Sequence, residues 1–311
     1  MTRLNELIEW ESVPIPAGAA VGSVPLMIGR AGRGAPVVLI AAGVHGDEGP
    51  WGAWAIHKLL TQTPADDLLG SLRVVPAANP LALEADARNA PLDTLDLNRT
   101  FPGSAHGSHT ERLAATLVER ALPGVDVVID LHGGGSWCVN AFAFRFAGGE
   151  ALSEAFAAPF IVDGPERQVT LTGYARSQGA RAAAIEMGGR GEHEVMWAAR
   201  IAAGLRRALG IVGVLRPPSD DQPLTASLPV GPTQVLRPSR GGVFVPELRG
   251  DAVGTVVAAG TTLGYLHDPA TMERLETFTA PFPQTALLLL RPTLTRIEGG
   301  AMTYVIAEPL A

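Results

Sequence analysis

Two side chains that often bind metal ions, an imidazole and a carboxylate, stand three positions apart at His45 and Glu48. They lie in the glycine-rich segment 43–50, which directly follows the apolar run at residues 36–42. Histidine nitrogens and glutamate oxygens are among the ligands that zinc prefers in proteins. We therefore expect a buried strand that ends in a loop presenting two zinc ligands.

Two later segments repeat this arrangement of an apolar run followed by a polar residue. Residues 125–131 end at His132, which precedes three glycines, and the apolar residues 182–185 end at Glu186. In an open parallel sheet the carboxyl ends of the strands share one edge, and ligands bind there. The four side chains can therefore converge although they are far apart in the sequence.

Two histidines and one carboxylate leave one tetrahedral position of zinc free for water, which is the catalytic rather than the structural pattern. Bound zinc lowers the pKa of its water to about 7 and polarises a carbonyl group. A further carboxylate must take the proton of the water and pass it to the leaving nitrogen, and Glu186 is the candidate. The competing interpretation is that the histidines are ordinary residues and that Glu186 forms a cap or a salt bridge.

Three further residues could support such a site. Asp130 shares one strand face with His132 and could orient its imidazole through the second ring nitrogen. Asn98 and Arg99 are adjacent, and the planar guanidinium of arginine binds carboxylates bidentately. Beside a zinc site this pair would hold the carboxylate end of a substrate, whereas in isolation it would be assigned to a surface loop.

The elements that position these residues alternate between short apolar runs and helical stretches from about residue 23 to residue 210, which predicts a mainly parallel α/β sheet. The predicted strands are 24–28, 37–42, 73–77, 125–131, 141–146 and 181–187. The predicted helices are 51–60, 110–122, 151–157 and 192–209, with Ser108 or Thr110 capping the second and Gly210 ending the last. Because every second residue of 141–146 is phenylalanine, this strand is expected at an edge or antiparallel.

A proline-rich acidic stretch at residues 216–223 continues neither a helix nor a sheet and predicts a domain boundary. Beyond it the pattern changes to short strands separated by glycine and proline. These strands are predicted at 242–245, 255–258, 262–266, 286–290 and 302–306. We therefore expect a catalytic domain at 1–215 and a smaller β-rich domain at 216–311.

The composition of the 311 residues, 47% hydrophobic and 18% charged, is typical of a folded protein with a sizeable core. A net charge of −7 argues against nucleic acid and anionic membranes as partners. Neither a signal pattern nor an apolar run approaching the ~20 residues of a membrane span occurs, which predicts a cytoplasmic protein. The single cysteine, Cys138, excludes an intrachain disulfide and is expected to be buried and inert.

Taken together, the motifs resemble those of the succinylglutamate desuccinylase/aspartoacylase family, which is related to the zinc carboxypeptidases. The order and spacing match over residues 35–210, and the glycine pattern of the tail is similar to the β domain of the family. The resemblance implies a zinc-carboxypeptidase-like mixed, mainly parallel sheet flanked by helices. It implies Glu186 as general base and acid, Asn98 and Arg99 as the clamp for the substrate carboxylate, and one zinc ion with three ligands: His45, Glu48 and His132.

The same resemblance implies hydrolysis of the amide bond of a small N-acyl amino acid, with the acyl group left open. Family members commonly have another arginine upstream of the Asn-Arg pair, and Arg88 is placed upstream but not securely aligned. If Arg88 does not reach the site, a small acyl group such as acetyl is favoured over a dicarboxylic substrate. The roles of Arg88 and Arg145 stay open, as does association into a homo-oligomer.

Four other functions compete with a deacylase. A carboxypeptidase would share the site, although a β domain that narrows the site mouth disfavours it. A serine esterase requires a Gly-x-Ser-x-Gly elbow, which the sequence lacks. A covalent biotin or lipoyl carrier requires a lysine in the β-rich domain, and the only lysine is Lys58. A non-catalytic metal-binding protein stays open.

Overall fold

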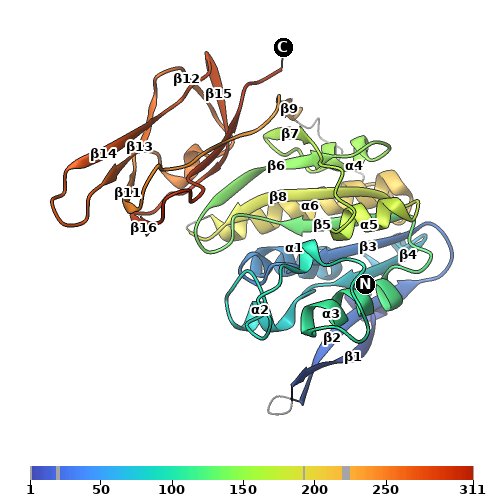
Figure 1. Ribbon diagram of the computed structural model, residues 1–311. Coiled ribbons are helices and arrows are strands. Elements are labelled where there is room, and N and C mark those ends of the chain that lie inside the picture. Colours follow the sequence, from blue (N-terminus) through green and yellow to red (C-terminus); the bar gives the residue numbers. More distant parts are fainter. Residues whose placement is uncertain (1, 19–21, 192, 219–224, 311) are drawn as a thin grey trace.

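The structure is a computed structural model that describes residues 2–18, 22–191, 193–218 and 225–310 (Figure 1). Within these residues one large sheet has 13 strands: β1 Glu9–Gly18, β2 Gly22–Gly32, β3 Val37–Ala42, β4 Ser71–Val75, β5 Val127–His132, β6 Val139–Arg145, β7 Phe160–Asp163, β8 Arg181–Gly189, β9 Leu228–Pro229, β10 Gln234–Leu236, β12 Val256–Ala258, β15 Gln284–Leu290 and β17 Tyr304–Ala307. Its main path runs β1-β2-β4-β3-β5-β8-β6-β15-β17-β10.

The centre of this sheet is parallel. Strands β4, β3, β5 and β8 lie side by side in the same direction, and β3 and β5 consist almost entirely of buried residues. Parallel strands covered on both faces are expected to be apolar throughout. Their register aligns Ala42 with Leu131 and His132 with Glu186, so the carboxyl ends of these strands meet at one edge.

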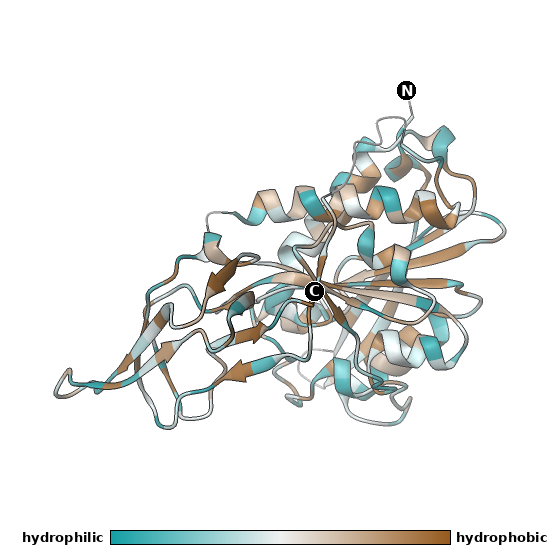
Figure 2. Ribbon diagram, turned by 90° about the horizontal axis from the view of Figure 1, so that it is seen from above, coloured by the Kyte–Doolittle hydropathy of each residue, from teal (hydrophilic) through white to brown (hydrophobic). Residues whose placement is uncertain are grey.

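Helices cover both faces of the sheet. The main core packs one face against α1 Gly49–Gln62, α4 Glu150–Glu154 and α6 Glu194–Val212. A second core packs the other face against α3 His109–Thr116 and α5 Leu171–Ser177. Figure 2 shows several strands in the brown of apolar residues, whereas the helices carry bands of both colours.

Most predicted elements are confirmed, with corrections at their ends. Strand 37–42 is exact, and strand 141–146 is antiparallel to β8, as expected from its pattern. Ser108 caps α3 in a capping box, but the α-helix changes into a π-helical turn at Leu117–Ala121. The predicted end at Gly210 is wrong, because α6 continues to Val212 and ends at Gly213, whose φ of +85° suits a glycine C-cap. Residue 192, the predicted start, lies outside the described residues.

The C-terminal part contributes to two sheets. One has the order β14-β13-β11-β16, with bounds β11 Gly242–Pro246, β13 Thr262–His267, β14 Arg274–Thr279 and β16 Thr295–Ile297. Strands β10, β12, β15 and β17 instead extend the large sheet, and β15 joins it by antiparallel pairing with β6. Figure 1 shows this part as an orange and red lobe beside the α/β layers.

The chain therefore has a mixed α/β fold with a C-terminal β-rich region, as predicted from the sequence. Its boundary near residue 215 stays a proposal, since strands from both sides of that position pair in one sheet. None of the described helices has both the length and the apolar character that a membrane crossing requires.

Candidate active site

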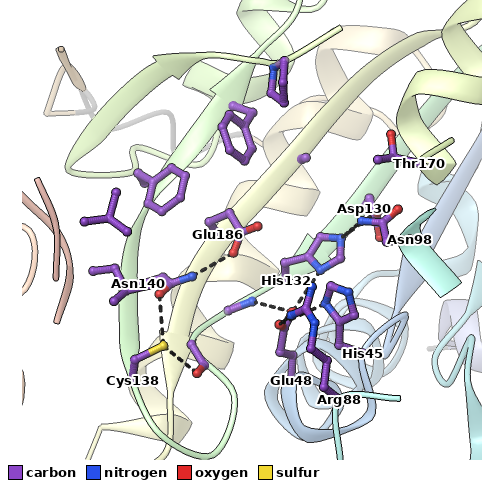
Figure 3. Close-up of a pocket in the computed structure, with 18 of the residues that line it drawn as sticks. His45, Glu48, Arg88, Asn98, Asp130, His132, Cys138, Asn140, Thr170 and Glu186 are labelled. Atoms are coloured by element: carbon purple, nitrogen blue, oxygen red, sulfur yellow. Dashed lines mark hydrogen bonds and ion pairs between the residues drawn. The ribbon is translucent and has the colours of Figure 1, made fainter. Parts of the chain in front are cut away.

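The predicted strand ends meet at one point of the sheet edge. His45 follows β3 and precedes the 3-10 helix η2 Gly46–Glu48, whereas His132 is the last residue of β5. The side chains of His45, Glu48 and His132 are buried, and one ligand atom from each lies within 4.8 Å of the others. Figure 3 shows these three side chains grouped at the strand ends.

Both imidazoles direct the same ring nitrogen at the Glu48 carboxylate. Nδ1 of His45 lies 3.0 Å from Oε1 of Glu48, and Nδ1 of His132 lies 2.9 Å from Oε2. Burial alone would raise the pKa of Glu48, but the two imidazoles outweigh it and hold that pKa well below its usual range. Glu48 is therefore an anionic carboxylate between two ring nitrogens.

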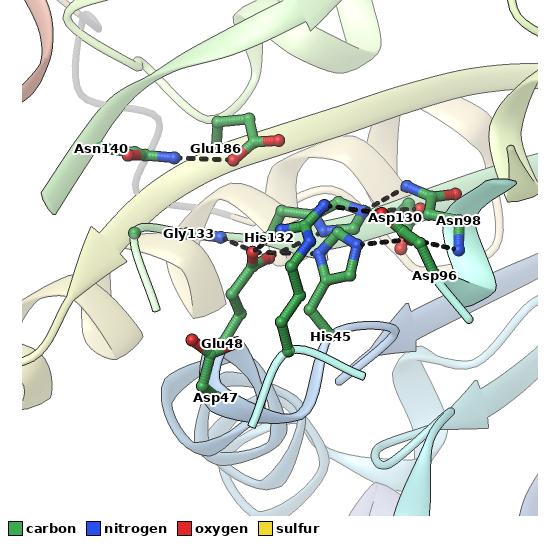
Figure 4. Close-up of polar contacts among 12 residues, drawn as sticks. His45, Asp47, Glu48, Asp96, Asn98, Asp130, His132, Gly133, Asn140 and Glu186 are labelled. Atoms are coloured by element: carbon green, nitrogen blue, oxygen red, sulfur yellow. Dashed lines mark hydrogen bonds and ion pairs between the residues drawn. The ribbon is translucent and has the colours of Figure 1, made fainter. Parts of the chain in front are cut away.

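The opposite nitrogen of each ring meets a second carboxylate (Figure 4). Nε2 of His45 lies 3.1 Å from Oδ1 of Asp96, and Nε2 of His132 lies 2.9 Å from Oδ2 of Asp130. A carboxylate in this position fixes the orientation and tautomer of a metal-binding imidazole. The contact predicted for Asp130 is thus present, and Asp96 provides the equivalent contact to the other ring.

This donor set fits a divalent cation such as zinc. The Nδ1 atoms of His45 and His132 and the carboxylate of Glu48 are the groups that would hold it. Among the protein groups themselves, burial lowers the pKa of both histidines, but the facing carboxylates raise it above the ordinary value. A metal ion would replace these ring protons, which is how metal binding is coupled to proton release.

Arg88 reaches this cluster. Its Nη1 donates to Oε1 of Glu48 at 3.2 Å, and its Nη2 donates to Oδ2 of Asp96 at 3.0 Å. Burial lowers the pKa of Arg88, but the two carboxylates raise it overall, so the guanidinium is a fixed positive charge at the site. The sequence favoured a small acyl group only if Arg88 did not reach the site. Arg88 does reach it, so that condition is not met.

Asn98 and Arg99 lie on the 3-10 helix η4 Leu97–Arg99, which begins after the capping residue Asp96. Asn98 Nδ2 lies 3.3 Å from Nε2 of His132, and its Oδ1 accepts a hydrogen bond from the backbone N–H of Leu171. Arg99 is exposed, and the contact found for its guanidinium is donation to the Asn98 carbonyl at 2.7 Å. Both residues line the same cavity as the metal-ligand candidates, and the guanidinium of Arg99 has no carboxylate partner among the described residues.

Glu186 lies on β8 directly beside His132 of β5. Its Oε2 accepts a hydrogen bond of 2.8 Å from Nδ2 of the buried Asn140, which belongs to β6 (Figure 4). Burial raises the pKa of Glu186, while the charge of His132 and the Asn140 hydrogen bond oppose that rise. A raised carboxyl pKa beside a metal site suits a group that must both accept and return a proton.

The loop 133–138 joins His132 to β6, and Asp47 holds it in place. Oδ2 of Asp47 accepts hydrogen bonds from the backbone N–H and the hydroxyl of Ser136, at 3.2 and 3.3 Å. Asp47, which stands between the ligand candidates His45 and Glu48, therefore positions this loop. Gly135 has a φ of +64°, and a Cβ there would lie 2.5 Å from Asp47, so this turn requires glycine. Trp137 packs against Arg291 of the C-terminal region, whose Cζ lies 4.2 Å from the centroid of the indole ring.

All of these groups surround one cavity of about 370 Å³, a size typical of small-molecule sites. Cys138 lines it and is buried, as predicted, and burial raises the pKa of its thiol well above the ordinary value. Arg145 does not line this cavity and is instead paired with Asp163 at 2.7 Å.

Comparisons with known proteins show which family this chain is similar to. A family model described as the succinylglutamate desuccinylase/aspartoacylase catalytic domain matches residues 34–212. N-alpha-acetyl-L-2,4-diaminobutyric acid deacetylase from Halomonas elongata is 40% identical over 112 residues, which are 36% of this chain and 32% of that enzyme. The match thus spans about a third of the curated relative.

Two solved structures are similar over nearly the whole chain. The product-bound ectoine utilization protein EutE (DoeB) from Ruegeria pomeroyi is 26% identical with a TM-score of 0.84, covering 97% of this chain and 95% of that one. A succinylglutamate desuccinylase/aspartoacylase from Rhodobacter sphaeroides is 26% identical with a TM-score of 0.83, covering 98% and 96%. Because the family model covers more than half of the 311 residues, this chain belongs to the succinylglutamate desuccinylase/aspartoacylase family.

Proposed function

We propose that this chain is a zinc-dependent deacylase that hydrolyses the amide bond of a small N-acyl amino acid, acting in the cytoplasm with one zinc ion. The observation that carries the proposal is the convergence of both Nδ1 atoms on Glu48 with Glu186 beside His132 on the next strand. The similarity to a diaminobutyric acid deacetylase and to an ectoine utilization protein supports an N-acyl amino acid as substrate.

The chemistry divides between the cation and the protein. A zinc ion, when bound, lowers the pKa of a ligated water to about 7 and polarises the amide carbonyl. Glu186 removes the proton of the water and delivers it to the leaving nitrogen, so that one water and one amide yield a carboxylate and an amine. Arg88 places a positive charge at the same site, where negative charge develops on the carbonyl oxygen.

The remaining side chains orient rather than react. Asp96 and Asp130 fix the two imidazoles through their Nε2 atoms. Asn98 and Arg99 supply amide and guanidinium donors that suit the carboxylate of the amino acid moiety. With the carboxylate held there, the amide nitrogen and carbonyl of a substrate extend from Asn98 toward Glu186.

A direct test combines elemental analysis with a screen for amine release. We expect about one zinc per chain, release of amine from N-acyl amino acids, loss of activity with a chelator and recovery with zinc. Dipeptides offered at the same concentration separate this function from a carboxypeptidase. Hydrolysis that persists at full rate in the metal-free protein would refute the proposal.

The clamp can be tested with Arg99→Lys. A point charge replaces the bidentate fork, so we expect KM for an N-acyl amino acid to rise roughly tenfold with little change in kcat. Arg33→Lys, an exposed arginine outside the cavity, serves as the matched control. If KM is the same in both variants, Arg99 does not bind the substrate carboxylate.

The pH dependence can be tested with Asn140→Leu. Glu186 must be ionised to accept a proton, so activity falls as the pH drops through its raised pKa. Asn140 donates to the carboxylate and favours its ionised form, so removing this donor raises the pKa further. The acidic limb of the kcat profile is therefore expected to shift to higher pH. A limb that stays in place would show that Asn140 does not tune Glu186.

A further inference from the structure

The face of the sheet that carries the catalytic residues continues beyond Glu186 and becomes apolar. Strand register places His132 beside Glu186, and Glu186 beside Phe142 on β6. Asn140 and Phe142 line the cavity, whereas the intervening Ala141 belongs to the main core on the opposite face. The wall next to the proton-transfer residue is thus a phenylalanine.

The C-terminal strands extend this wall. Register aligns Asn140 with Leu289 of β15, Leu289 with Val305 of β17, and Val305 with Val235 of β10. Leu289, Val305 and Val235 all line the same cavity as the metal-ligand candidates. Tyr304, next to Val305, belongs to the main core, which confirms that alternation directs Val305 to the cavity side. We call Phe142, Leu289, Val305 and Val235 the apolar wall.

The apolar wall and the carboxylate clamp lie on opposite sides of Glu186. Asn98 contacts His132 on β5, and the strand order from there is β5-β8-β6-β15-β17-β10. Figure 3 shows the labelled side chains in the same spatial order, from Asn98 past His132 to Glu186 and Asn140. Adjacent strands are about 4.8 Å apart, so the three spacings from β8 to β17 span roughly 14 Å. This distance is more than an acetyl group needs.

We propose that the apolar wall is the acyl subsite and that the preferred substrates carry an unbranched apolar acyl group of about four to six carbons. The inference rests on the proposed function, since it orders the substrate as carboxylate, nitrogen, carbonyl and acyl chain from Asn98 toward Val305. Among the described residues, the cavity-lining side chains of β6, β10, β15 and β17 carry no charge. The second carboxylate of a succinyl group would therefore lie unpaired against this wall.

The test is a series of N-acyl derivatives of one amino acid with acetyl, butanoyl, hexanoyl and succinyl groups, assayed with the zinc-loaded full-length protein. Burying a methylene is worth about 0.8 kcal/mol, so kcat/KM is expected to rise about threefold to fourfold for each methylene added. The succinyl derivative is expected to react at least about tenfold more slowly than the butanoyl one, because its carboxylate is desolvated without a partner.

Val305→Thr localises the effect with little change in side-chain volume. A hydroxyl on the wall is expected to lower the hexanoyl-to-acetyl ratio of kcat/KM about fivefold, since the hydroxyl group loses hydration without gaining a partner. Val256→Thr is the matched control, because Val256 is an exposed valine of β12 in the same sheet and does not line the cavity. The control is expected to keep the wild-type ratio.

Three outcomes count against the subsite. A flat series, or one that favours acetyl or succinyl, overturns the apolar acyl preference while the deacylase function stands. A ratio that changes equally in Val305→Thr and Val256→Thr removes the wall as its cause. Hydrolysis of no member of the series by zinc-loaded protein overturns the proposed function together with the subsite.

Discussion

Glu186→Gln is expected to lower kcat by roughly 10²- to 10⁴-fold while the zinc content stays the same as in the wild type. Glutamine keeps the volume and the hydrogen-bond acceptor that meets Asn140, but it cannot accept the proton of the attacking water. The metal-ligand candidates are untouched, since Glu186 is not among them. The measurement pairs steady-state kinetics with elemental analysis of the same preparation.

Glu154→Gln provides the control for this substitution, because Glu154 is an exposed glutamate of α4 that does not line the active-site cavity. It is expected to retain wild-type kcat. A Glu186→Gln enzyme that turns over within about threefold of the wild type would show that another group transfers the proton, since a general base contributes 10² or more.

His132→Ala is expected to lose most of the bound zinc and with it nearly all activity. The substitution removes one of three ligand candidates and leaves Glu48 and Asp130 facing each other without the imidazole between them. Zinc that binds only the folded protein stabilises it by mass action, so added zinc should raise the Tm of the wild type but not of the variant. Elemental analysis and thermal denaturation with and without zinc measure both effects.

His57→Ala is the matched control, since His57 is an exposed histidine of α1 stacked on Trp54. It is expected to bind zinc as the wild type does. Because His132→Ala could unfold the chain, His45→Ala gives a second route to the same result with a different ligand removed. Stoichiometric zinc in both folded variants would refute the ligand set.

The parts of the site that follow regular strands could be predicted from the sequence. His45 and His132 each follow an apolar run, and parallel strands bring such ends together without further information. The resemblance to the family is confirmed by the match over residues 34–212. His132 and Glu186 are aligned in the register of β5 and β8. For this reason two strand ends that are far apart in the sequence contribute to one site.

The parts that depend on irregular chain or on distant pairing could not be predicted. Arg88 and Asp96 reach the site through loop backbone, and periodicity says nothing about loop paths. Asn140 meets Glu186 because of the register in which β6 pairs with β8, and the sequence pattern predicts the antiparallel direction of this strand but not its register. Strand β1 contains Pro14 and Pro16, which disfavour a strand in a sequence pattern, yet proline is tolerated in a strand at the sheet edge.

The pairing of β15 with β6 has a consequence for how this molecule can be divided. Cutting the chain at residue 215 would remove Leu289, which pairs with Asn140 between strands β15 and β6. It would also remove the Arg291 side chain that covers Trp137. The fragment would expose a stretch of unpaired strand edge next to its own active-site loop, and such edges recruit other chains. The pairing of β15 with β6 therefore affects both the solubility of the protein and its turnover. The two parts of the chain are not interchangeable modules for fusion or domain exchange.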